Sequence, residues 1–201
     1  MKFKALMLAF FAVFLLIFFS GCTSNNTDNN PSDGNDNWLE NYTPVHSVGN
    51  GTDNFWIDFP VGSPSAGQSV DHLTWITDDL KEKSVIFVCH KSGCSACTPQ
   101  ADNVKALRET YGEDAIFYDL DNPFPGYGVA TEDTLKKFDE VFYYDANGPP
   151  SYIAFTGVFT LINDTGAVKI GWHTWEGNVE ESVTESWIKD AIYYYQLNNG
   201  E

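Results

Sequence analysis

The sequence predicts an α/β domain of three layers, in which helices flank a mixed central sheet. Three observations lead to this prediction: a strand–helix–strand unit near the middle of the chain, a β-hairpin after it, and an amphipathic helix that closes the chain. Strands that alternate with helices in this way bury one shared core between layers.

The strand–helix–strand unit begins with residues 84–89, a continuous apolar run typical of a strand that is buried on both faces. A helix follows, which ends at Gly112 and whose apolar face is formed by Ala101, Val104, Leu107 and Tyr111. Residues 115–120 form the next apolar strand. Two strands joined by a helix are expected to be parallel, with a right-handed crossover. An earlier helix is predicted between Val70 and Leu80.

The second half of the chain predicts one more helix, a hairpin and a closing helix. A loop rich in proline and glycine leads into a helix over residues 131–144. Residues 159–163 and 167–174 flank an Asp-Thr-Gly turn, as in a β-hairpin. The closing helix is predicted to begin at Asn178.

The first residues predict export. A basic start precedes an apolar run over residues 5–19, which is shorter than the roughly 20 residues needed to cross a bilayer. Residues 1–21 are therefore predicted to be a secretory signal. The sequence Phe19-Ser20-Gly21-Cys22 resembles the lipobox of prokaryotic lipoproteins, which implies a lipid on Cys22 and a place on the extracytoplasmic side of the cell membrane. An ordinary signal cut elsewhere, or an uncleaved anchor, remains the alternative.

The chain after Cys22 is divided into a linker and one domain. Residues 22–53 are mostly Asn, Asp, Ser, Thr and Gly, and such a segment is expected to be a flexible linker that holds the domain away from the membrane. Residues 54–201 have the length of one ordinary domain.

The charge of the chain excludes one class of partner. The formal net charge is −17 at pH 7. Nucleic acids and anionic headgroups bind positive surfaces, so we expect no nucleic-acid partner and contact with the membrane through the N-terminal lipid alone.

Cys94 and Cys97 form a C-x-x-C pair at the predicted junction between a buried strand and a helix. The free N–H groups of a helix start carry partial positive charge and stabilise a thiolate, the species that attacks disulfides. This placement predicts a redox dithiol. The alternative is a structural disulfide, which would add little stability because the loop that it closes is so short. Cys89, inside the strand, is expected to be a core thiol.

A metal site is the other alternative for this pair. A four-cysteine zinc site needs a second pair, which the chain lacks. His90 precedes the pair, and together His90, Cys94 and Cys97 could bind Cu(I) or Zn. We assign no metal and no cofactor, and we keep a soft-metal carrier as an alternative function.

At these positions the chain resembles the thioredoxin-like superfamily. The residues that carry the resemblance are the 85–88 strand leading to Cys94-Ser95-Ala96-Cys97, and residues 155–162 with the turn after them. The resemblance implies that Cys94 is the nucleophile and Cys97 the resolving thiol. It also implies an extracytoplasmic thiol–disulfide oxidoreductase whose partners are thiols and disulfides of exported proteins and a membrane electron donor or acceptor.

The predicted active-site loop departs from the pattern of that superfamily. The loop is predicted to include His90 and Phe159, together with Gly93, Ser95 and Ala96 at the places where a Trp or Pro is usual. Val88 takes the place of a buried acidic residue.

The superfamily also has a cis-proline at the start of the hairpin. The turn spacing favours a register that puts Phe159 there, with a trans peptide bond. The alternative register uses Pro150. Because this proline is missing in the favoured register, a redox-inactive interaction module is kept as a further alternative function.

Overall fold

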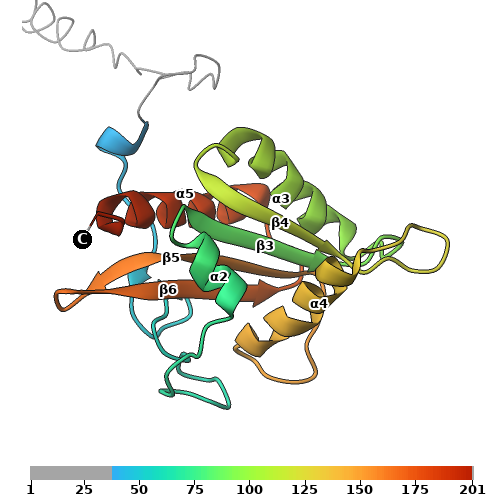
Figure 1. The fold of residues 1–201 in the computed structure, drawn as a ribbon, viewed down its shortest axis with the longest axis horizontal. Helices are drawn as coiled ribbons and strands as arrows, with labels where there is room; N and C mark the ends of the chain where they lie inside the picture. The colour runs from blue at the N-terminus through green and yellow to red at the C-terminus, as the bar shows by residue number, and fades with distance from the viewer. Residues whose placement is uncertain (1–37, 201) are drawn as a thin grey trace, which may run out of the picture. The chain divides into compact units, whose positions relative to one another are not determined.

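The fold is built on a four-stranded mixed sheet. The computed structural model describes residues 38–200 (Figure 1). The strands are β3 (Ser84–His90), β4 (Ala115–Asp121), β5 (Phe155–Asp164) and β6 (Ala167–Glu176), in the order β4-β3-β5-β6. β3 and β4 are parallel, whereas β5 is antiparallel to both β3 and β6. The predicted parallel unit and hairpin are therefore both present.

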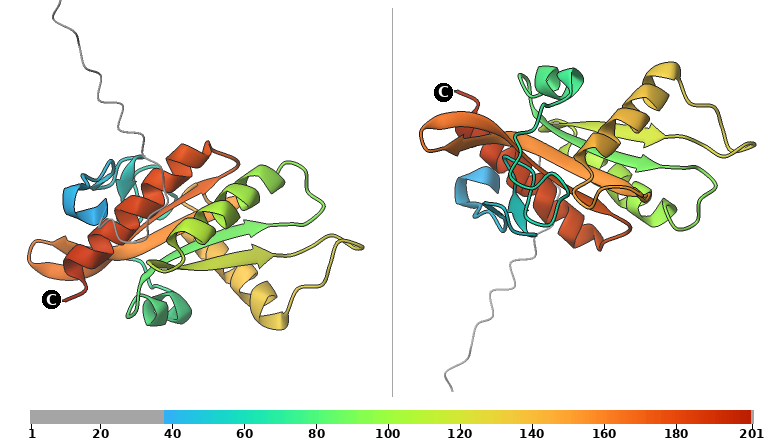
Figure 2. Two further views of the ribbon diagram at one scale, coloured as in Figure 1. Left: turned by 90° about the horizontal axis from the view of Figure 1, so that it is seen from above. Right: turned by 90° about the horizontal axis from the view of Figure 1, so that it is seen from below.

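Helices cover both faces of this sheet. One face packs against α3 (Thr98–Tyr111) and α5 (Glu181–Asn198), which the left view of Figure 2 shows in front of the strands. The other face packs against α2 (Thr74–Asp79), α4 (Glu132–Glu140) and the 3-10 helix η2 (Val141–Tyr144). The predicted three-layer α/β architecture is confirmed.

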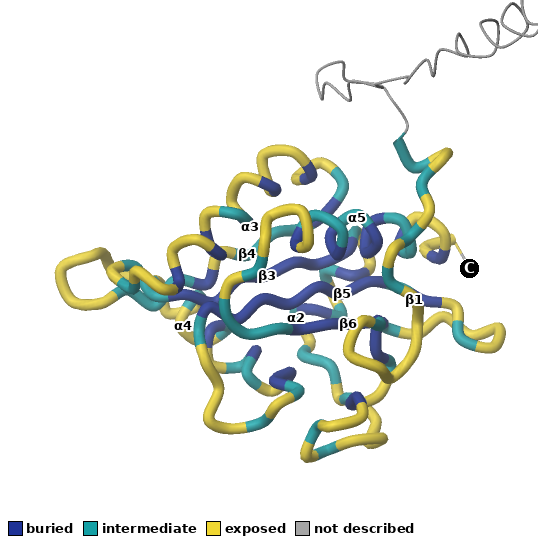
Figure 3. The backbone as a smooth tube through the Cα atoms, turned by 180° about the vertical axis from the view of Figure 1, so that it is seen from behind, coloured by how far each residue is buried: buried dark blue, intermediate teal, exposed yellow. Residues whose placement is uncertain are grey.

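β3 is a central strand of the sheet, and every one of its residues is buried (Figure 3). Its side chains alternate between the two faces: Ile86 and Val88 pack toward α3 and α5, whereas Phe87 and Cys89 pack toward α2 and α4. A strand with two covered faces needs apolar residues at every position, which explains the unbroken apolar run in the sequence.

Local sequence sets the ends of α3. Pro99 lies in the first turn, where its fixed φ suits a helix and its missing N–H costs nothing. Gly112 closes the helix as predicted, and its N–H donates to the carbonyl of Arg108 at 2.9 Å.

Three predicted boundaries are wrong. α2 spans only Thr74–Asp79, shorter than predicted, and α5 begins at Glu181 instead of Asn178. β5 begins at Phe155, four residues before the predicted start of the hairpin. Only the last of these shifts affects the site.

The N-terminal strap, residues 38–53, packs onto the domain and is not a free linker. It contains the 3-10 helix η1 (Trp38–Asn41) and β1 (Ser47–Val48), which pairs in parallel with β2 (Asn54–Phe55). Residues 38–53 therefore belong to the same compact unit as residues 54–200, in contrast to the expected boundary at residue 53.

The strap is held by the buried carboxylate of Asp190 on α5, which has no exposed side-chain surface. It accepts hydrogen bonds from Tyr42 Oη at 2.5 Å, from His46 N and Nδ1 at 2.7 Å each, and from Val45 N at 3.1 Å. The His46 ring stacks on Trp187, 3.5 Å between centroids. The right view of Figure 2 shows the strap beside α5.

The predicted signal over residues 1–21, Cys22 and the rest of the linker up to residue 37 lie outside the described residues. In the part of the chain that the structure describes, no helix has both the length and the apolar character to cross a membrane.

Candidate functional site

The dithiol lies between the end of β3 and the start of α3. Cys94 and Cys97 are joined by a disulfide, with their Cα atoms 5.4 Å apart. The turn between them is closed by backbone hydrogen bonds to the carbonyl of Cys94, from Cys97 N at 3.1 Å and from Thr98 N at 3.2 Å. The chain therefore brings the two predicted cysteines together at the first turn of α3.

The two cysteines differ in exposure. Cys94 is half-buried, whereas Cys97 is fully buried in the core cluster that also contains Val88 and Ala101. Cys97 is the N-cap residue of α3. The unpaired N–H groups of the first turn carry partial positive charge and favour a thiolate beside them. A partner can therefore reach Cys94, while Cys97 is accessible only from within the protein.

The arrangement of the sheet and the dithiol together decide the fold family. A parallel β3–α3–β4 unit is followed by α4, the antiparallel β5–β6 hairpin and α5. The disulfide lies at the start of the first of these helices. The fold is thioredoxin-like. The resemblance found in the sequence is thus confirmed at the level of the fold.

Comparisons with known proteins find distant similarity to solved structures. No protein-family model matches the chain, and no curated protein matches it either. The solved structures with a similar arrangement include the germline-specific thioredoxin Deadhead from Drosophila melanogaster, with 13% identity, a TM-score of 0.34, and coverage of 56% of this chain and 86% of that one.

Two further solved structures are similar to the same degree. The pneumococcal exposed lipoprotein thioredoxin Etrx1 from Streptococcus pneumoniae has 17% identity, a TM-score of 0.32, and coverage of 56% of this chain and 88% of that one. The MTB protein DsbF has 11% identity, a TM-score of 0.31, and coverage of 53% and 79%. With scores this low, the thioredoxin-like fold rests on the sheet topology and the position of the disulfide.

The loop residues predicted around the dithiol are found there. Ser95 and Ala96 lie between the cysteines and are exposed. Gly93 precedes Cys94 with a φ of +91°, a left-handed conformation that favours glycine. A Cβ on Gly93 would come within 2.8 Å of the Tyr127 ring, so this aromatic side chain lies directly against the loop.

Gly93→Ala is expected to lower the free energy of unfolding by about 2 kcal/mol, because it combines an unfavourable φ with a clash against Tyr127. The measurement is urea denaturation. Gly126→Ala is the matched control, because Gly126 has a φ of +92° and open space around its Cβ direction. Equal losses in the two variants would contradict the contact between Gly93 and Tyr127.

The prediction that Phe159 belongs to the active-site loop is wrong. Phe159 lies in the middle of β5, is fully buried, and packs against Phe87 and Tyr144 on the face opposite α3. Gly157 and Val158 also lie inside β5 and not at its start. The register chosen from the turn spacing is therefore also wrong.

The chain that precedes β5 contains two cis peptide bonds, Pro149–Pro150 and Ile153–Ala154. Pro150, the alternative in the sequence, is therefore cis but lies five residues before the strand. Ala154, directly before β5, is fully buried in the same core cluster as Cys97. No sequence signal marks Ala154, since the peptide bond there does not involve proline.

His90 makes its hydrogen bond within the protein. Its Nε2 lies 2.5 Å from Asp119 Oδ1 on β4, and its side chain is only 5% exposed. Burial raises the pKa of Asp119, but the hydrogen bond and charge of His90, together with the charge of Lys105, outweigh burial and hold that pKa below its usual value. Asp119 is therefore ionised at neutral pH.

The sequence reasoning missed Asp119 and Asp121. Both lie near the C-terminal end of β4, and their register partners on β3 are Val88 and His90. Asp121 accepts hydrogen bonds from Ser92 N at 2.7 Å and from Ser92 Oγ at 2.6 Å. The signal that could have found them is the spacing of two acidic residues two positions apart in a strand, which places both on one face.

A pocket of about 240 Å³ lies beside the dithiol. Its walls include His90, Gly93, Thr98, Lys105 and Tyr127. Gly93 and Thr98 flank the cysteine pair on its two sides, so the pocket borders the dithiol along the side that carries the His90–Asp119 pair.

The residues of the metal-carrier alternative have partners within the described part of the protein. Among residues 38–200, no three His, Cys, Asp or Glu side chains are arranged to hold a metal ion. His90 Nε2 is engaged by Asp119, and Cys94 is bonded to Cys97. Cys89 is buried and free, and burial raises the pKa of its thiol, as expected for a core cysteine.

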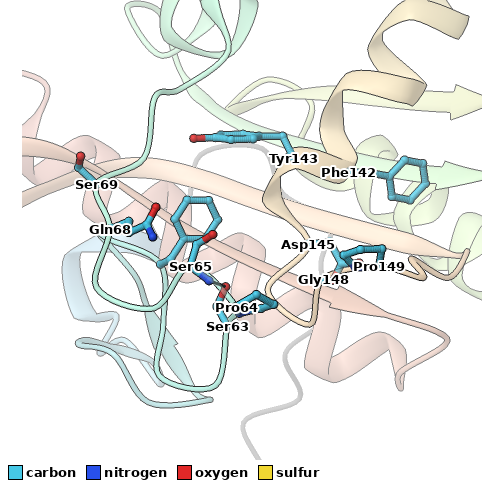
Figure 4. Close-up of a pocket in the computed structure, with 11 residues that line it drawn as sticks. Ser63, Pro64, Ser65, Gln68, Ser69, Phe142, Tyr143, Asp145, Gly148 and Pro149 are labelled. Atoms are coloured by element: carbon cyan, nitrogen blue, oxygen red, sulfur yellow. Dashed lines mark hydrogen bonds between the residues drawn. The ribbon is translucent and has the colours of Figure 1, made fainter.

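A second pocket, of about 260 Å³, lies away from these residues. Figure 4 shows it between the loop that carries Pro64 and Gln68 and the turn that carries Asp145 and Gly148, with Tyr143 at its edge. It includes neither cysteine of the dithiol.

Proposed function

We propose that this protein is a thiol–disulfide oxidoreductase that exchanges disulfides with exported proteins. The observation that carries the proposal is the Cys94–Cys97 disulfide at the start of α3, with one sulfur reachable and the other buried. A purely structural disulfide has no need of this asymmetry, whereas disulfide exchange requires one accessible and one protected thiol.

The exchange takes place in two steps. In the reduced protein, the Cys94 thiolate attacks a sulfur of the client disulfide, which forms a Cys94–client bond and releases the first client thiolate. Cys97 then attacks Cys94, the protein disulfide forms, and the second client sulfur leaves as a thiolate. The client gains two electrons and two protons, which the dithiol loses. In the reverse direction the same steps oxidise the client.

The proposal places the domain on the extracytoplasmic side of the cell membrane, attached through a lipid on Cys22. A membrane electron donor or acceptor would then restore the dithiol. Metabolic labelling with a radioactive fatty acid tests the anchor. Label on the full chain that is lost in Cys22→Ala supports it, and an unlabelled wild type contradicts the anchor without affecting the redox chemistry.

Cys97→Ser is expected to accumulate mixed disulfides with exported proteins, because Cys94 can still attack but nothing resolves the product. The measurement is non-reducing electrophoresis of cells that express the variant, followed by identification of the adducts. Cys94→Ser should trap nothing, and Cys89→Ala, which removes a buried thiol outside the dithiol, should behave as the wild type. The absence of any adduct in Cys97→Ser would contradict the proposal.

The direction of exchange depends on the reduction potential of the pair. The full chain can be equilibrated anaerobically in defined thiol buffers and its redox state read by alkylation mass. A value near roughly −270 mV would identify a reductant, and one near roughly −120 mV an oxidant. A pair that never forms a disulfide in solution would refute the redox function.

A further inference from the structure

The burial of Cys97 raises the question of where its proton goes. Cys97 must lose a proton before it can attack Cys94, yet it has no exposed surface. Val88 lies in the same core cluster and cannot accept a proton. An internal group is therefore needed to take the proton and later return it.

His90 has the geometry of such a group. The ionised carboxylate of Asp119 only accepts hydrogen bonds, so the His90 Nε2 that lies 2.5 Å from it carries a hydrogen. In the neutral ring, Nδ1 then carries a lone pair. Within residues 38–200 the structure gives Nδ1 no hydrogen bond, and the nearest carboxylate oxygen, Asp121 Oδ1, lies 3.7 Å away. A base that a carboxylate orients in this way is typical of proton-transfer sites.

The pocket of about 240 Å³ joins His90 to residues that flank the dithiol. His90 lines it together with Gly93 and Thr98, the residues immediately before Cys94 and after Cys97. A cavity of this size with polar walls has room for water, and one water molecule is enough to carry a proton between a base and a reacting group.

Several charged groups face the His90 ring. From β4, Asp119 and Asp121 present carboxylates to the two ring nitrogens. From α3, Lys105 Nζ lies 3.3 Å from Asp119 Oδ2, and Asp102 lines the same pocket. The Ser92 hydroxyl donates a hydrogen bond to Asp121 Oδ2. In this set the three carboxylates outnumber the one cation.

We propose that His90, oriented by Asp119, is the acid–base group for Cys97 and acts through water in this pocket. The inference rests on the proposed function. The Cys97 thiol gives its proton to His90 Nδ1, the thiolate attacks Cys94, and the bond between Cys94 and the client sulfur breaks. The client leaves as a thiolate and takes up a proton, which the imidazolium can supply. Asp119 is a positioning residue.

The test follows the two steps separately. The reduced full chain is mixed rapidly with one equivalent of dithiobis(nitrobenzoate), a coloured disulfide. Attack by Cys94 releases the first nitrothiobenzoate, and resolution by Cys97 releases the second. In His90→Asn, the second phase is expected to slow roughly 100-fold at neutral pH, at the low end of general acid–base effects, while the first phase stays within a few-fold. The part of the pH profile of the second phase that His90 contributes should be lost, while the rise that comes from ionisation of the Cys97 thiol should remain.

Two further variants test whether the effect is specific to His90. Asp119→Asn should slow the second phase less than His90→Asn and alter its pH profile. His72→Asn, on the opposite face of the sheet beside Tyr144, is the matched histidine control and should leave both phases unchanged. Circular dichroism verifies that each variant is folded.

The outcomes separate the two proposals. A wild type with two phases and a folded His90→Asn with an unchanged second phase would overturn the role of His90 and leave the oxidoreductase intact. If His90→Asn is unfolded, an unchanged second phase and pH profile in a folded Asp119→Asn would overturn it instead. A wild type that never releases the second nitrothiobenzoate would refute the proposed function, and the acid–base role with it.

Discussion

Asp190→Ala is expected to lower the free energy of unfolding by about 3–5 kcal/mol, because it removes one buried acceptor that several hydrogen bonds share. The carboxylate has no exposed surface and accepts hydrogen bonds from Tyr42, from Val45 N and from two nitrogens of His46. Its removal leaves all of these donors without an acceptor, and unpaired buried donors are costly. Urea denaturation at pH 7 measures the loss.

The same substitution should release the N-terminal strap. Limited proteolysis is expected to cut residues 38–53 in Asp190→Ala under conditions in which the wild type is resistant. Asp190→Asn, which keeps the shape but not the charge, should fall between the two. Glu109→Ala on the exposed side of α3 is the control for the loss of an acidic residue. An unchanged unfolding free energy together with an unchanged cleavage pattern would show that Asp190 does not hold the strap.

Acid is expected to destabilise the protein through two histidines, the buried His173 and the half-buried His72. Burial lowers the pKa of His173 to about 3 and that of His72 to about 4. In the unfolded chain both have the ordinary pKa of about 6.5. Below pH 6.5 the unfolded chain therefore binds more protons than the folded one. Stability is complete above that pH and falls as the pH approaches 4 for His72 and 3 for His173.

The size of this effect follows from the same shifts. Each histidine contributes at most about 1.4 kcal/mol per pH unit, so together they should cost roughly 3–4 kcal/mol between pH 6.5 and pH 5. Urea denaturation at a series of pH values measures the slope. In His173→Asn the slope should be reduced by about half. His173 packs between the rings of Trp56 and Trp187, so some loss at pH 7 is also expected. A slope that is the same in wild type and variant would contradict the burial of a neutral His173.

Local sequence was enough to predict the layers and the dithiol, because the relevant signals are short in range. The apolar run before His90, the helix that ends at Gly112 and the two cysteines between them lie within one continuous stretch. Their spacing alone predicts a βαβ unit with a reactive pair at its junction. The structure has this unit at those positions.

The register of β5 could not be predicted in the same way. Residues 155–160 are buried without exception, so the alternation that normally shows which residues face the core is absent. The turn at residues 164–166 then remained the only guide, and it put Phe159 beside the dithiol. The strand is longer than the turn spacing suggested, so Phe159 lies in its middle and not at its start.

The N-terminal strap and the His90–Asp119 pair were missed because their partners are distant in sequence. The strap looks like a linker by composition, and the residue that binds it lies about 145 positions later on α5. Asp119 is 29 residues from His90 and meets it only through the parallel pairing of β3 and β4. Composition and periodicity describe each segment alone and carry no information on such contacts.

The docked strap limits how far the domain could lie from a lipid on Cys22. Residues 38–53 pack on the domain, so only residues 22–37 of the predicted linker remain between Cys22 and the strap. A fully extended chain spans at most about 3.5 Å per residue, so these residues could bridge at most roughly 55 Å, half of what the whole segment would allow. If Cys22 carries the proposed lipid, the strap would therefore stay within that distance of the bilayer surface.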